Sequence, residues 1–147
     1  MPSGIILYCC LLLISACSAF GQMEKTSYKV EQKGKIKKYS FHVPKGYQLN
    51  SWTGGYENEK QYWYPDSSVF YITKEHGLPS INYENIRAVE GANANRMLSD
   101  TLTLQGKDKQ GLYWKDIKQI GFSYGFSRVP GEKREIFEAI MKEISSH

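Results

Sequence analysis

The stretch LYWKDIKQIGFSYGFSRV, residues 112–129, decides the fold of this chain. In its second half, phenylalanine or tyrosine stands at every second position, with small or polar residues between. This period of two is typical of a β-strand with one buried face. The first half has strand character as well. We therefore predict strands over 112–120 and 121–129, within an antiparallel sheet.

Runs of the same kind, further from this stretch, predict six more strands. The turns between them carry their own signals. Lys33-Gly34 is a two-residue hairpin connection, because glycine tolerates the positive φ of a primed turn. The segment 65–68, Pro-Asp-Ser-Ser, combines residues that favour turns. The six strands are expected over 27–32, 35–43, 47–52, 60–64, 69–73 and 101–105.

Two helices are predicted beside the strands. Pro130 marks the start of a C-terminal helix, because proline suits the first turn of a helix. On this helix, Glu138 and Lys142 have the spacing of an i,i+4 ion pair. A shorter helix, capped at Asn82, is predicted around 83–89. The apolar residues that share one face of the C-terminal helix are Ile136, Phe137, Ile140 and Ile144.

Together these elements predict an α+β fold. We expect an antiparallel β-meander sheet of about seven or eight strands, with the C-terminal α-helix packed on one face. The middle helix is a candidate for the same face. No internal repeat, low-complexity tract or linker divides the sequence. We therefore expect a single globular domain over 27–147.

The first 17 residues carry a different signal and all three cysteines. The apolar run Ile5–Leu13 is shorter than the roughly 18–20 residues that cross a bilayer as a helix, which indicates a cleavable export segment. Ile14-Ser15-Ala16-Cys17 follows it and resembles the lipobox of bacterial lipoproteins, in which a peptidase cuts before the cysteine and a diacylglyceryl group is attached to its sulfur. The resemblance implies a signal peptide over 1–16, a lipid on Cys17, a tether over 17–26 and a place in the bacterial cell envelope.

A second cleavage site competes with the lipobox. Ala19-Phe20-Gly21 has small residues at the two positions that signal peptidase I requires. A cut there would release a soluble, secreted protein that begins at Gln22. Both alternatives place the rest of the chain outside the cytoplasm. Because no cysteine follows Cys17, the mature protein has no internal disulfide and depends on its hydrophobic core.

The chain carries 19 basic and 15 acidic side chains, a net charge of +4 that is too small to indicate a nucleic-acid partner. Six lysines crowd the region beside the expected lipid. They either contact an anionic membrane surface, at about 1 kcal/mol each, or keep the edge of a solvated hairpin from pairing with other strands. These lysines are Lys25, Lys29, Lys33, Lys35, Lys37 and Lys38.

Gly121-Phe122-Ser123-Tyr124-Gly125 matches the G-x-S-x-G pattern of a nucleophile elbow. That elbow needs a helix directly after the serine, and an acid and a histidine further along the chain. Here the strand alternation continues, and His147 is the one histidine that follows, so we interpret the motif as ordinary strand. The histidines lack the spacing of a zinc site, and no phosphate-binding glycine loop occurs. We predict no enzymatic activity, cofactor or metal.

Aromatic residues are densest between Trp52 and Tyr71. In a strand, Tyr62 and Tyr64 point to one side and Trp63 to the other, so a single helix layer cannot bury all three. The aromatic residues either stabilise the sheet by cross-strand packing or form a binding patch. That patch would consist of Trp52, Tyr56, Tyr62, Trp63 and Tyr64.

Three classes of function remain open. The first is a membrane-tethered module that binds or inhibits a protein partner. The second is a glycan-binding accessory protein of the envelope, which would stack tryptophan or tyrosine on sugar rings. The third is a small envelope hydrolase. We favour the first class, because it requires only an exposed patch and an anchor.

Overall fold

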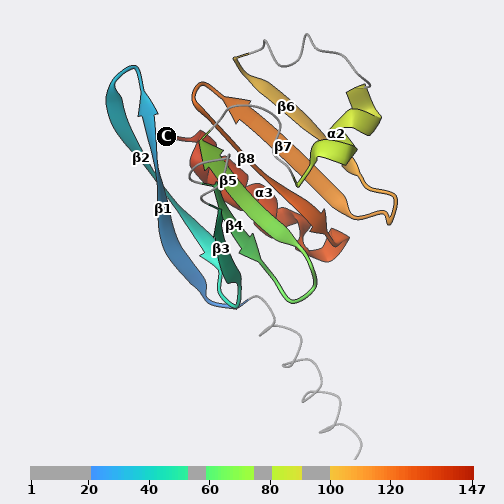
Figure 1. Cartoon of the computed structure of the whole chain (residues 1–147). Helices are drawn as coiled ribbons and strands as arrows, with labels where there is room; N and C mark the ends of the chain where they lie inside the picture. The colour runs from blue at the N-terminus through green and yellow to red at the C-terminus, as the bar shows by residue number, and fades with distance from the viewer. Residues whose placement is uncertain (1–20, 53–58, 75–80, 91–99) are drawn as a thin grey trace, which may run out of the picture.

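Most of the residues that the structure describes lie in β-strands. The computed structural model describes residues 21–52, 59–74, 81–90 and 100–147, and for Trp52 and Glu90 it describes the backbone only. These residues form antiparallel strands and a C-terminal helix, as predicted (Figure 1). The elements are β1 (Met23–Gln32), β2 (Lys35–Pro44), β3 (Gln48–Trp52), β4 (Glu59–Trp63), β5 (Val69–Lys74), α2 (Tyr83–Glu90), β6 (Leu102–Lys107), β7 (Tyr113–Gln119), β8 (Phe122–Val129), a 3₁₀ turn η2 (Gly131–Lys133) and α3 (Arg134–Ser145).

The described strands form two sheets, so the expectation of a single meander was wrong. β1 and β2 form a two-stranded sheet of their own, and the other six strands follow the order β3-β4-β5-β8-β7-β6. After β5 the chain reaches the far edge of the sheet at β6 and then returns, so that β8 lies beside β5 (Figure 1). An alternating pattern identifies a strand but not the strand it pairs with. β1 also begins at Met23, so residues 23–26 of the expected tether are paired strand.

Both predicted turns are confirmed. Lys33 and Gly34, between β1 and β2, have φ angles of 51° and 74°, which are typical of a type I′ turn. Between β4 and β5, the Asp66 carboxylate accepts hydrogen bonds from the backbone N–H of Ser68 (3.1 Å) and from its hydroxyl (2.6 Å). This is the local side-chain chemistry that makes aspartate and serine common in turns.

One face of the six-stranded sheet is covered by the β1–β2 hairpin and α3 together. The Tyr62 hydroxyl lies 3.0 Å from that of Thr26, and the Tyr64 hydroxyl donates to the Pro44 carbonyl (3.0 Å), so both tyrosines tie the hairpin to the sheet. No helix in the described ranges is long and apolar enough to cross a membrane. α3 lies against β2 and β8, and its predicted core face is confirmed by the burial of Phe137, Ile140, Met141 and Ile144.

The opposite face carries a buried polar cluster beside α2. The Tyr71 hydroxyl donates a hydrogen bond to the Asp116 carboxylate, and the Asn82 amide lies 3.1 Å from the Tyr71 hydroxyl and 3.0 Å from the Phe126 carbonyl. Burial, reinforced by Asp116, raises the pKa of Tyr71 far above its usual value, so the phenol keeps its proton. Because Asn82 immediately precedes α2, the cluster places that helix on the side away from α3 (Figure 1).

Gly125 provides the space for this cluster. A Cβ atom at this position would clash with the Lys115 carbonyl oxygen and with the Tyr71 hydroxyl. Ser123 is buried inside β8, and its hydroxyl has no hydrogen-bond partner among the described residues. The strand continues from Ser123 to Val129 without a turn into a helix, so the G-x-S-x-G segment has the geometry of a packed strand.

We predict that Gly125→Ala destabilises the protein by about 3 kcal/mol or more, because neither the β7 backbone nor the Tyr71 ring has room to move aside. Gly131→Ala is the matched control, since a Cβ there makes an ordinary contact with Tyr113. It should change the free energy of unfolding by less than about 0.5 kcal/mol. Urea denaturation followed by tryptophan fluorescence measures both variants. Equal stability of the two would contradict the close approach at Gly125.

Candidate functional site

The predicted aromatic patch is divided between the two faces of the sheet. Tyr62 and Tyr64 are only 1% and 9% exposed and belong to the core under the hairpin. Trp63 is half-buried on the opposite face, as alternation along β4 requires. The side chain of Trp52 and all of Tyr56 lie outside the described residues. Of the three predicted residues whose side chains the structure describes, Trp63 and the largely buried Tyr64 line a surface groove, and Trp63 is the more exposed of the two.

This first groove lies between β3 and the β4–β5 turn and has a volume of about 480 Å³. Gln48 pairs directly with Trp63, and Asn50 pairs with Gln61, so both amide side chains belong to the same face as the indole. β3 is an outer strand of the sheet. The groove thus combines an aromatic ring, hydrogen-bonding amides and a strand edge. We call it the Trp63 groove; its lining residues are Gly46, Gln48, Asn50, Trp63, Tyr64, Pro65 and Ser67.

A β-bulge in β8 brings Arg128 to the Trp63 indole. Tyr113 pairs with Val129, whereas Lys115 pairs with Phe126. One residue of β7 therefore faces two residues of β8, and the bulge redirects the side chains that follow. Arg128 has a φ of 56°, in the left-handed region that residues other than glycine seldom adopt. Its guanidinium lies 5.5 Å from the centre of the Trp63 ring, which is the range of a cation–π contact.

Hydrogen bonds along β4 fix the orientation of the Trp63 indole. The indole N–H donates to the Gln61 side-chain oxygen (2.8 Å), and the Gln61 amide in turn donates to the Glu59 carboxylate. Glu59 is only 2% exposed. Burial raises the pKa of this carboxyl group, and the hydrogen bond from Gln61 offsets part of that effect. The ring that faces the groove is therefore held by a buried polar chain.

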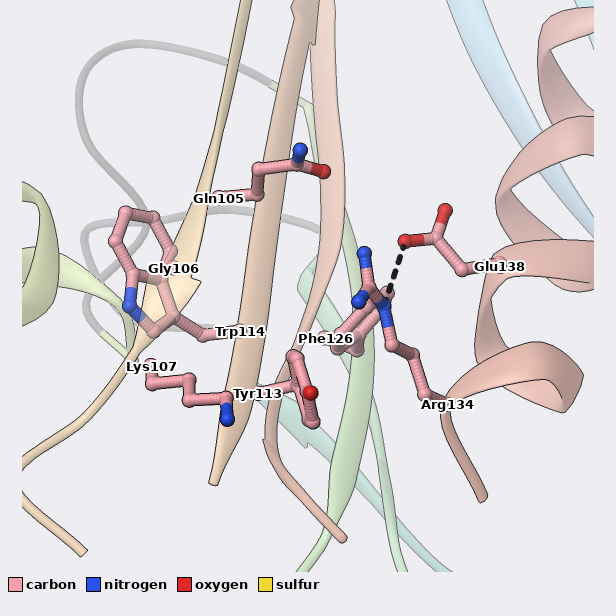
Figure 2. Close-up of a pocket in the computed structure, with 8 residues that line it drawn as sticks. All are labelled: Gln105, Gly106, Lys107, Tyr113, Trp114, Phe126, Arg134 and Glu138. Atoms are coloured by element: carbon pink, nitrogen blue, oxygen red, sulfur yellow. Dashed lines mark ion pairs between the residues drawn. The ribbon is translucent and has the colours of Figure 1, made fainter. Parts of the chain in front are cut away.

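A second groove lies on the α3 side of the sheet, where the edge strand β6 and its neighbour β7 face the N-terminal part of α3 (Figure 2). Its volume is about 260 Å³. Lys107 lies opposite Tyr113 in the β6–β7 pairing, and Arg134 approaches the same tyrosine from the helix. We call this the Tyr113 groove; its lining residues are Gln105, Gly106, Lys107, Tyr113, Trp114, Phe126, Arg134 and Glu138.

Two cations flank the Tyr113 ring. The Lys107 ammonium lies 4.8 Å from the ring centre and the Arg134 guanidinium 4.6 Å from it. Hydrogen bonding and charge, first from Lys107 and then from Arg134, lower the pKa of the Tyr113 phenol. Glu138 forms ion pairs with Lys115 (2.6 Å) and Arg134 (3.7 Å). The partner expected for Glu138 from helical spacing was Lys142, and that expectation was wrong because β7 lies closer to this face of α3.

The six predicted lysines are all exposed on the β1–β2 hairpin. Lys29 and Lys38 stand directly opposite each other across the two strands, a like-charge arrangement that opposes pairing. Lys37 donates a hydrogen bond to the backbone carbonyl of His147 (2.7 Å). The expected lipidation site, Cys17, lies outside the described residues. Within the described part of the chain, no three His, Cys, Asp or Glu side chains come together as a metal site would require.

Sequence reasoning did not find Arg128, Lys107, Tyr113 or Arg134. Nothing in the local sequence indicates a bulge at Arg128, because no glycine or asparagine accompanies its positive φ. Lys107 lies in the predicted turn between the strands expected over 101–105 and 112–120, and Tyr113 lies near the start of the second strand, so neither was assigned a role. Their approach to Arg134 depends on packing between β6, β7 and α3. Trp63 could be predicted from the sequence, because alternation along a strand turns it to the face opposite Tyr62 and Tyr64.

We predict that Glu59→Gln stabilises the protein at neutral pH. Because the pKa of Glu59 is raised in the folded state, its contribution to the free energy of unfolding is largest below the ordinary carboxyl pKa. That contribution decreases as the pH rises through the raised pKa. Glutamine keeps a hydrogen-bond acceptor for Gln61 and has no charge to bury. The free energy of unfolding of the variant should therefore exceed that of wild type by about 1 kcal/mol near pH 7 and by little near pH 4.

Urea denaturation of wild type and Glu59→Gln at the two pH values measures this difference. Glu132→Gln, which changes an exposed glutamate, is the control. A stability difference between wild type and Glu59→Gln that is the same at both pH values would contradict the prediction.

Comparison of the chain with known protein families, with curated proteins and with solved structures found no match. The proposals that follow therefore rest on the Trp63 groove, the Tyr113 groove and the lysine-bearing hairpin.

Proposed function

We propose that this protein is a non-enzymatic binding module of the bacterial cell envelope, tethered by a lipid on Cys17, and that it binds or inhibits a protein partner through the Trp63 groove. The observation that carries the proposal is the contact between Arg128 and Trp63, whose indole lines that groove. Trp and Arg are the residue types most enriched among the energetically dominant residues of protein interfaces.

The backbone of Arg128 argues that this contact serves more than folding. A non-glycine residue in the left-handed region costs about 1–3 kcal/mol. An exposed cation–π contact returns about 0.5–1 kcal/mol. Glycine or asparagine would adopt the same backbone with less strain. Strained residues of this kind concentrate at binding sites, so an arginine here is better explained by recognition than by stability.

The position of the groove suits a protein partner. β3 is an outer strand of the six-stranded sheet. A partner that covers this edge would contact the indole and the amides of Gln48 and Asn50, and one that extends along the same face toward β8 would also contact the guanidinium of Arg128. The aromatic ring would form the buried centre of the interface and the amides its polar rim.

A glycan is the second candidate for this groove, because amides beside an indole can bind sugar hydroxyls while the ring stacks on the sugar. Arg128 lies over the Trp63 ring, so a sugar would have to stack on the other side of the indole. This restriction makes a protein the better candidate.

The hairpin lysines support a position close to a membrane. β1 begins six residues after Cys17, and six extended residues span at most about 20 Å. A lipid on Cys17 would thus keep the hairpin near the bilayer surface. There each lysine that reaches anionic lipid contributes about 1 kcal/mol. The membrane would also relieve the repulsion between Lys29 and Lys38.

We predict that Trp63→Ala and Arg128→Asn each weaken partner binding by about tenfold or more. Crosslinking in intact cells identifies the partner, and titration of the purified pair measures the affinity. Tyr83→Ala and Arg87→Asn, at exposed positions of α2, are the matched controls and should bind as wild type. Wild-type affinity in both groove variants would exclude the Trp63 groove. Retention of the wild type on envelope polysaccharide, lost in Trp63→Ala, would favour the glycan.

Stability measurements on Arg128→Asn separate recognition from folding. Asparagine tolerates the left-handed backbone, so the free energy of unfolding should stay within about 1 kcal/mol of wild type. A larger decrease would show that the arginine is needed for the fold, and the argument from strain would then fail.

We predict that the native protein carries a diacylglyceryl group on an N-terminal Cys17. Intact-mass analysis of protein extracted from membranes should give the mass of residues 17–147 plus the lipid. Cys17→Ser should abolish the lipid and the membrane retention. A lipid-free mass that starts at Gln22 would refute the anchor and indicate a secreted protein.

A further inference from the structure

We infer that the Tyr113 groove is a binding site for a doubly charged tetrahedral oxyanion, and we assign it to the phosphate of a phosphate monoester. The inference does not rest on the proposed function, because Trp63 and Arg128 belong to the other face of the sheet. It rests on the charges that converge on Tyr113, on the size of the groove and on the donors around it (Figure 2).

The Tyr113 groove carries an excess of two positive charges. Lys107, Lys115 and Arg134 surround it, and Glu138 is the acid that the structure places among them. The carboxylate of Glu138 lies 2.6 Å from the Lys115 ammonium and 3.7 Å from the Arg134 Nε. Glu138 therefore shares its single negative charge between Lys115 and Arg134. The group of four side chains keeps a net charge of +2, which is available to a ligand.

The position of Arg134 is only partly explained by helix stability, through its i,i+4 ion pair with Glu138. It is the first residue of α3, where the helix dipole disfavours a cation. Its guanidinium nevertheless lies over Tyr113, 4.6 Å from the ring centre. Lys107 approaches the same ring to 4.8 Å. Two cations around one phenol repel each other, and an anion bound beside the phenol hydroxyl would offset that repulsion.

The dimensions of the groove match a single anionic group. Its volume of about 260 Å³ is below the roughly 300–1,000 Å³ of sites for drug-sized ligands. A small charged group fits such a groove better than a large cofactor.

The donors around the groove favour phosphate over carboxylate. The planar guanidinium of Arg134 can donate two parallel hydrogen bonds to one oxyanion. The Lys107 ammonium supplies a point charge, and the Tyr113 hydroxyl supplies a further donor. Three donor groups on separate elements suit the several oxygens of a tetrahedral anion. The net charge of +2 matches the two negative charges of a phosphate monoester.

The test is a titration of the full chain, carrying ¹³C-labelled tyrosine and held in uncharged nanodiscs, with inorganic phosphate at constant ionic strength. Loss of one signal in Tyr113→Phe identifies the Tyr113 resonance. We expect that resonance to shift saturably with phosphate, and the phenol to titrate at higher pH when phosphate is bound, because the anion neutralises the two cations. Acetate at the same ionic strength should produce a much weaker response.

The variants make the expectation specific. Lys107→Gln and Arg134→Gln should each weaken phosphate binding by about tenfold or more. Glu138→Gln, which removes the competing carboxylate, should strengthen binding several-fold, a gain that a misfolded protein cannot show. Lys109→Gln, an exposed lysine of the β6–β7 turn, is the charge-matched control and should bind as wild type. Equal phosphate affinity in wild type, Lys107→Gln and Arg134→Gln would overturn the inference, as would an unsaturable shift.

A second part of the experiment distinguishes a phosphate monoester on a lipid from one in solution. Nanodiscs that contain phosphatidic acid present the group on a lipid, whereas glycerol phosphate presents it in solution. A shift of Tyr113 in phosphatidic-acid nanodiscs without added phosphate assigns the site to a lipid headgroup. A response to glycerol phosphate alone assigns it to a soluble ester. No response of Tyr113 to either of them or to inorganic phosphate would refute the site.

Discussion

The hydrogen bond from Tyr71 to Asp116 is the interaction on which the rest of the fold depends. It joins β5 to β7 across β8, in the space that Gly125 leaves open. A buried carboxylate that loses its donors costs several kcal/mol, so a strand order that separated β5 from β7 would be strongly unfavourable. Asn82 adds the start of α2 to the same cluster. The order β5-β8-β7 and the side on which α2 lies thus follow from satisfying one buried acid.

The two grooves exist because neither face of the sheet is covered uniformly. The hairpin and α3 lie side by side over the core, and the edge strand β6 and its neighbour β7 face the N-terminal part of α3, where the Tyr113 groove lies (Figure 1). On the opposite face, the bulge in β8 directs Arg128 toward Trp63. Both grooves therefore lie where the structure departs from a regular, evenly covered sheet. One departure is the layer formed by the hairpin and α3, and the other is the bulge in β8.

Several cations occupy positions where the fold gains little from them. Arg128 has a strained backbone, Arg134 begins a helix, and Lys29 faces Lys38 across the hairpin. Local violations of this kind are expected at functional positions. The three positions lie on different surfaces, which is consistent with our proposal of a small tethered domain that contacts a partner, an oxyanion and a membrane separately.

The sequence by itself determined the strands, the two turns, the C-terminal helix and its buried face, because alternation and turn chemistry depend on near neighbours. It also placed Trp63 away from Tyr62 and Tyr64. Only the tertiary structure decided that the hairpin forms its own sheet, that β8 inserts beside β5, and that Arg128 reaches Trp63. The physical reason is that periodicity records whether a residue is buried, whereas its contacts depend on segments that are distant in the chain. The Tyr113 groove, formed by β6, β7 and a helix, shows this most clearly.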